Sequence, residues 1–91
     1  MAEDVPVMPG LVEDRAAALV FDKPTGRILT AEARGNVTRN AVLAFYAQTL
    51  PQLGWQSLSE TRFQREAEIL RLEISHPGGA LTVRFELTPR Q

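Results

Sequence analysis

The chain has 91 residues, enough for one modest hydrophobic core but too few for two. Ten basic and eleven acidic residues are interspersed and give a net charge of −1, which excludes the clustered positive excess typical of a nucleic-acid binder. There is no cysteine and no apolar run of the ~18 residues that a membrane helix needs, so disulfides, thiolate nucleophiles, cysteine-based zinc sites and a membrane span in this chain are excluded.

Residues 1–14 show no hydrophobic period and contain Pro6 and Pro9, each of which biases the preceding residue towards extended backbone. They are predicted to form an extended N-terminal arm that docks some of its apolar side chains on the core. Residues 15–91 are predicted to form a single α+β domain. The start carries no recognisable signal peptide; if a leader has been removed, a periplasmic or envelope location is favoured over the cytoplasm.

Residues 15–22, RAAALVFD, are predicted to form a strand that is buried on at least one face, with Leu19 and Phe21 sharing a face. The turn residues Asp, Pro and Gly follow at 22–26. Residues 27–34 are then predicted to complete an antiparallel hairpin.

The next segment carries the clearest helix signal in the chain. Thr38 is a good N-cap, with Asn36 as its competitor. We expect Phe45 to be among the most buried residues, because it lies at the centre of the apolar stripe. The stripe consists of residues at helical spacing, namely Val42, Phe45, Tyr46, Thr49, Leu50 and Leu53.

Pro51 determines where this helix ends, because it has no N–H to donate to the preceding turn. The regular helix is predicted to end near Leu50, followed by a looser turn with Gly54 as the final stop. Trp55 is expected to begin the next strand. Tyr46 and Trp55 are interpreted as a core pair between helix and sheet, and a ligand cage is the alternative.

Residues 55–75 fit two interpretations. Charged residues alternating with branched apolar ones favour three short strands over 55–59, 62–66 and 69–75. The alternative is a second helix, because four apolar residues also fall at helical spacing, namely Phe63, Ala67, Leu70 and Ile74.

The last run of alternating residues, 81–88, is the clearest strand, and its pairing with the preceding strand can be predicted. A two-residue turn would place Arg71 opposite Arg84, whereas a four-residue loop places Arg71 opposite Glu86. The four-residue loop, Pro77 to Ala80, is therefore preferred. The resulting fold class is α+β, with a single antiparallel sheet in the order β-β-α-β-β-β-β and one amphipathic helix packed on one face.

No residue pattern indicates a catalytic centre, a metal site or a cofactor site. His76 is the only histidine, and a solvated turn histidine is favoured over a general base or a metal ligand. Carboxylate pairs are interpreted as solvated charge, since nothing indicates a cleft that would raise a pKa. The pairs are Glu3 with Asp4, Glu13 with Asp14, and Glu66 with Glu68.

The best candidate for a recognition loop is the first hairpin turn. Its candidate binding residues are Asp22, Lys23, Thr25 and Arg27, which gather two cations and one acid on an exposed turn. A plain hairpin turn without a binding role is the alternative.

Three segments stand out as motifs: the helix pair Phe45-Tyr46 with its LPQLGW ending at 50–55, the VPVMPGL opening at 5–11 and the FDKPTGR turn at 21–27. Together they resemble small uncharacterised bacterial α+β domains, which are often exported or membrane-anchored. The resemblance implies an α+β fold and an envelope location. It implies no activity and no site residues.

Three functional hypotheses follow. The leading one is a non-enzymatic binding or accessory domain, with an unidentified protein or small ligand as its partner. The second is a small-ligand carrier or enzyme with a pocket between helix and sheet, lined by Tyr46, Arg39 and a strand carboxylate. The third is a structural domain that self-associates through an unpaired edge strand, and the oligomeric state is expected to be a monomer or a weak dimer of this kind.

Overall fold

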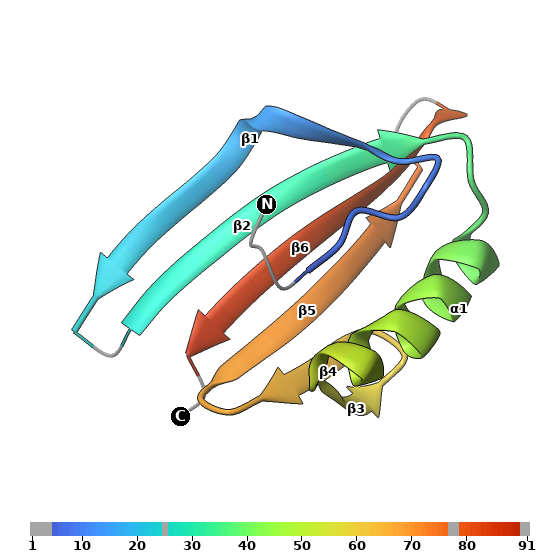
Figure 1. Cartoon of the computed structure of the whole chain (residues 1–91). Helices are drawn as coiled ribbons and strands as arrows, with labels where there is room; N and C mark the ends of the chain where they lie inside the picture. The colour runs from blue at the N-terminus through green and yellow to red at the C-terminus, as the bar shows by residue number, and fades with distance from the viewer. Residues whose placement is uncertain (1–4, 25, 77–78, 90–91) are drawn as a thin grey trace.

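The computed structural model describes residues 5–24, 26–76 and 79–89, which form one antiparallel sheet and one α-helix (Figure 1). In chain order the elements are β1 (Val12–Lys23), β2 (Gly26–Gly35), α1 (Arg39–Thr49), the 3₁₀ helix η1 (Leu50–Leu53), β3 (Gln56–Ser59), β4 (Arg62–Arg65), β5 (Glu68–Ser75) and β6 (Leu81–Pro89). The six strands lie in the order β1-β2-β6-β5-β4-β3. The α+β fold class and the predicted order of elements are therefore confirmed.

Helix α1 begins and ends where its capping residues predict. The Oγ1 atom of Thr38 accepts a hydrogen bond from the N–H of Ala41 at 3.1 Å, so Thr38 and not Asn36 is the N-cap. At the other end the chain tightens into η1 at Pro51. Gly54 then adopts a left-handed φ of 94° and donates its N–H to the carbonyl of Pro51 at 3.2 Å.

The region 55–75 forms three strands, so the alternative of a second helix is wrong. Strands β3, β4 and β5 differ from the predicted ranges by one residue at their ends. Alternation of charged and branched residues was thus a better guide here than helix propensity.

The pairing of β5 with β6 follows the four-residue-loop prediction. Arg71 lies opposite Glu86, and Glu73 lies opposite Arg84. Arg71 Nη1 and Glu86 Oε1 are 4.0 Å apart. Residues 77–78 of the connecting loop lie outside the described residues.

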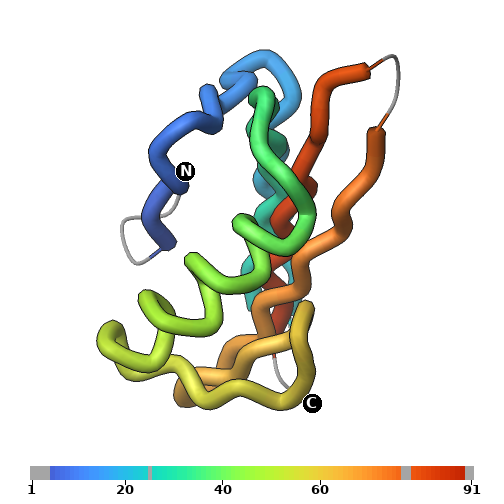
Figure 2. The backbone as a smooth tube through the Cα atoms, turned by 90° about the vertical axis from the view of Figure 1, so that its right-hand side faces the viewer, coloured from blue at the N-terminus to red at the C-terminus, as the bar shows by residue number. Residues whose placement is uncertain are grey.

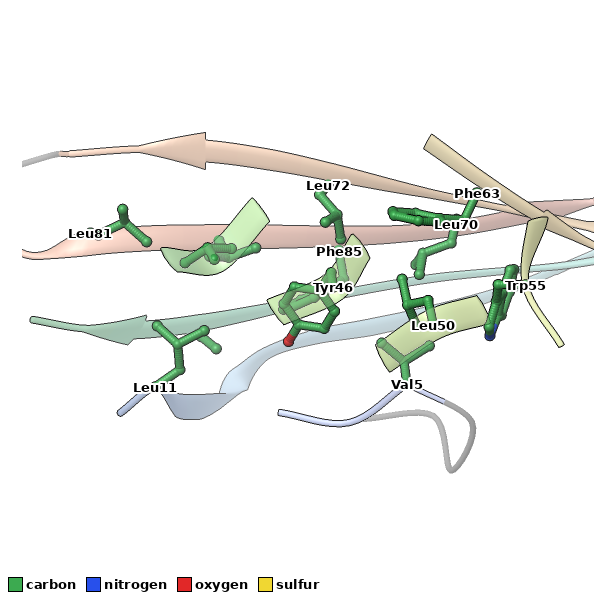
Figure 3. Packing of buried hydrophobic residues seen from close by; sticks show 13 residues of the cluster. Val5, Leu11, Tyr46, Leu50, Trp55, Phe63, Leu70, Leu72, Leu81 and Phe85 are labelled. Atoms are coloured by element: carbon green, nitrogen blue, oxygen red, sulfur yellow. The ribbon is translucent and has the colours of Figure 1, made fainter. Parts of the chain in front are cut away.

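The core lies between one face of the sheet and a layer made by α1, η1 and the N-terminal arm, which share that side (Figure 2). Tyr46 is fully buried, with its ring centroid 5.5 Å from that of Phe85, and Trp55 is 2% exposed beneath the guanidinium of Arg65. Their interpretation as core residues is therefore confirmed. The buried cluster (Figure 3) comprises Val5, Leu11, Ala33, Val42, Tyr46, Leu50, Trp55, Phe63, Leu70, Leu72, Leu81, Val83 and Phe85.

The expectation that Phe45 would be among the most buried residues is wrong. The line of the helix that faces the sheet runs through Val42, Tyr46 and Leu50, which are spaced four residues apart and fully buried. Phe45 lies beside this line and is only partly buried, packing edge-on against Tyr46. The predicted stripe does lie on the side of the helix that faces the sheet, but Tyr46 and not Phe45 is at its centre.

The arm docks on the core as predicted. Strand β1 begins at Val12, three residues earlier than predicted, so residues 12–14 belong to the sheet and not to the arm. Val5 and Leu11 of the arm are buried. Between them the hydroxyl of Tyr46 donates to the carbonyl of Pro6 at 2.8 Å and accepts from the N–H of Met8 at 3.3 Å. The hydroxyl of Tyr46 points towards the arm in Figure 3. One helix residue therefore both fills the core and holds the arm.

Strand β1 is present but uncovered. It contains the strand predicted over 15–22, yet the prediction of burial on at least one face is wrong, because residues 19–21 are exposed on both faces. A helix is about 10 Å wide, whereas six strands spaced ~4.8 Å apart span roughly 24 Å. Helix α1 lies towards β4 and β5, and the arm runs in front of the central strands, so the outer end of the β1–β2 hairpin has no cover (Figure 1).

Candidate interaction surface

Strand β1 is the longer of the two strands at the edges of the sheet. It has 12 residues, whereas β3 at the opposite edge has four. Within the described residues β1 pairs only with β2. Alternate N–H and C=O groups of such a strand face away from the sheet and are a template for another strand.

An irregularity divides β1 into two paired segments. Regular pairing with β2 breaks between Asp14 and Leu19, so residues 15–18 bulge out of the ladder. The carboxylate of Asp14 accepts a hydrogen bond from the N–H of Ala16 at 3.1 Å within this bulge. The outer segment, from Leu19 to Lys23, pairs regularly with β2 as far as the hairpin tip.

Three consecutive large apolar side chains are exposed on this outer segment. Leu19, Val20 and Phe21 are 53%, 55% and 54% exposed, and we call them the apolar edge. Leu19 and Phe21 lie on the sheet face away from α1, opposite Thr30 and Ile28 of β2, and Val20 lies on the other face. Large apolar side chains that are exposed on both faces of an unpaired edge strand are typical of an interaction site.

The predicted recognition residues flank the apolar edge at the hairpin tip. Asp22 lies opposite Arg27, with Arg27 Nε and Asp22 Oδ1 3.3 Å apart, and both side chains are largely exposed. Lys23 is also exposed, whereas Thr25 lies outside the described residues. The tip therefore brings Asp22 and Arg27 together as an exposed ion pair, which contributes little to stability, ~0.2–1 kcal/mol.

The space between helix and sheet, where a ligand pocket was considered, is occupied at Tyr46. Its side chain is fully buried against Phe85, and its hydroxyl is bonded to the arm. An open hollow of about 220 Å³ lies elsewhere, at the end of the sheet beside the hairpin tip. Its lining residues are Gly26, Arg27, Ala67, Glu68 and Pro89.

The groups able to do chemistry are dispersed. His76 is exposed just after β5. Among the described residues no three or more His, Asp or Glu side chains gather in a way that would hold a metal ion, and no described helix is long and apolar enough to cross a membrane. Burial raises the pKa of Tyr46 to about 12, while the hydrogen bond from the Met8 N–H acts in the opposite direction.

The apolar edge was missed from the sequence because residues 15–22 were assigned to the core. The available signal was the imbalance between six predicted strands and one short helix, which leaves part of the sheet without cover. Comparisons of the chain with protein-family models, curated proteins and solved structures found no match. Any indication of function therefore comes from the surface of the molecule itself.

Proposed function

We propose that this chain is a non-enzymatic binding domain that takes an extended segment of a partner protein onto the β1 edge. The observation that carries the proposal is the apolar edge: three consecutive large apolar side chains, each more than half exposed, on the outermost strand. An added strand would pair with the outward backbone groups of β1. Its neighbouring side chains would cover Leu19 and Phe21 on one face and Val20 on the other.

The expected affinity is modest. Full burial of a Leu, Val or Phe side chain is worth ~1.5–3 kcal/mol, and about half of each is still exposed here, so the apolar edge supplies about 3 kcal/mol in total. Backbone hydrogen bonds add ~0.5–1.5 kcal/mol each. Association itself costs about 4–15 kcal/mol, so binding through this edge alone is reversible and weak unless the partner adds contacts.

Selection of random peptides displayed on phage against the folded domain tests the proposal. Enriched peptides would be titrated against the wild type, F21K and L58K. Leu58 is a matched control, because it is 46% exposed and lies on β3 at the opposite edge. We expect F21K to weaken peptide binding at least about tenfold, because a lysine blocks an edge strand, and L58K to bind as the wild type does.

Equal thermal midpoints for the three proteins would show that the fold is intact. Peptides that bind F21K as tightly as the wild type, or that lose affinity for L58K instead, would place binding away from β1. Failure to enrich any peptide would also count against the proposal.

A further inference from the structure

We infer that the partner of the apolar edge is a second copy of this chain, joined by antiparallel pairing of the two β1 strands about a two-fold axis at Val20. This inference rests on the proposed function and names its partner. The two sheets would become one continuous sheet, with both helices on the same face.

Symmetry restricts the possible registers. In an antiparallel pair, residues directly opposite each other point to the same face, so residues facing α1 in one copy must oppose residues facing α1 in the other. A two-fold axis perpendicular to the sheet satisfies this only if it passes through a residue and not between two residues. Within the apolar edge the axis therefore lies at Leu19, Val20 or Phe21.

Two of these three registers are unfavourable. An axis at Leu19 sets Val20 and Phe21 opposite Ala18 and Ala17 of the second copy, so neither meets a large apolar side chain. An axis at Phe21 sets Leu19 opposite Lys23 and Val20 opposite Asp22, so two apolar side chains meet charged ones.

The axis at Val20 avoids these conflicts. Leu19 of each copy then lies opposite Phe21 of the other, which gives two aliphatic–aromatic pairs on the face away from the helices. Val20 meets its own counterpart on the face that carries the helices. The apolar edge is thus self-complementary in this register alone.

The interface is small. In this register the bulge at residues 15–18 limits regular pairing to residues 19–21 of each copy, because Asp22 and Lys23 face Ala18 and Ala17 of the bulge. Its area falls below the ~1,200 Å² of a standard stable interface, so the dimer is weak and depends on concentration. We expect half-association at about 0.1–1 mM.

Sedimentation equilibrium between about 10 µM and 1 mM tests for the dimer. The wild type and L58K are expected to move from monomer towards dimer over this range. F21K is expected to need at least about tenfold higher concentration, because each copy would place a lysine against Leu19.

Single cysteines test the register, since the natural chain contains none. Directly opposite side chains have Cβ atoms ~4.5–5.5 Å apart, close to the range that a disulfide spans. Under mild oxidation V20C should cross-link at least about tenfold faster than L58C. L19C and F21C should each react slowly alone but should cross-link with each other when mixed.

The outcomes separate this inference from the proposed function. A chain that stays monomeric at 1 mM but binds selected peptides at β1 would overturn the second copy as partner and leave the binding edge standing. A monomer that also binds no peptide would overturn both. A dimer that is unchanged in F21K, or in which V20C reacts no faster than L58C, would show that self-association uses another surface.

Discussion

Replacing Tyr46 with phenylalanine tests how the N-terminal arm is held on the core. The substitution keeps the buried ring and removes only the hydroxyl, which donates to the carbonyl of Pro6 at 2.8 Å and accepts from the N–H of Met8 at 3.3 Å. Both arm groups are only partly buried, so water can replace part of what is lost. We expect the free energy of unfolding to fall by about 1–2 kcal/mol, against ~3–5 kcal/mol for Y46A, which also empties the core.

The pH dependence of stability gives an independent test of the same contact. Burial raises the pKa of Tyr46 to about 12, against its ordinary value of 10.0 in the unfolded chain. The folded state therefore keeps a proton that the unfolded state loses. The contribution of this proton to the free energy of unfolding is therefore fully present below about pH 10. It is lost as the pH rises towards 12, by about 1.4 kcal/mol per pH unit at most. Y46F cannot lose a phenol proton and should lack this component.

Three measurements check the argument. Tyr46 is the only tyrosine, so the phenolate absorbance of the native protein titrates this residue alone. Urea unfolding of wild type and Y46F between pH 8 and 11 gives the linkage. Hydrogen exchange at the Met8 amide should be at least about tenfold faster in Y46F, because its acceptor is gone. A native phenol that titrates near its ordinary value, or a Met8 amide that exchanges equally in both proteins, would refute the role of this hydroxyl.

Three further substitutions test other parts of the fold. In G35A the added Cβ would meet the backbone carbonyl of Gly10. We therefore expect the free energy of unfolding, measured in urea, to fall by ~1–3 kcal/mol and the arm to be cleaved faster by proteases. An unchanged stability would mean that the arm does not approach β2 so closely. F45A should cost about 1–2 kcal/mol by the same assay, and a loss as large as that of Y46A would restore Phe45 as the centre of the stripe. H76A should change the free energy of unfolding by no more than ~0.5 kcal/mol, because the side chain is exposed. A larger loss would reveal a partner for this side chain.

Local chemistry was readable from the sequence wherever neighbouring residues decide the structure. The N-cap at Thr38 follows from a side-chain oxygen that reaches an N–H three residues ahead. The helix stop follows from the missing N–H of Pro51. The pairing of Arg71 with Glu86 follows from strand alternation and the length of one loop. None of these depends on what packs over the element.

Tertiary structure decided which faces are covered. Periodicity shows which residues share a face, but burial depends on how much of the sheet the helix and the arm cover. The sheet is roughly twice as wide as the helix. The limited reach of this layer explains why the run RAAALVF, which looks like a buried strand, ends in exposed Leu19, Val20 and Phe21. Tyr46 and not Phe45 faces the core because of how the helix is rotated against the sheet, which periodicity does not fix. The sequence determined the elements and their order, whereas the apolar edge exists because the layer above the sheet stops before it reaches β1.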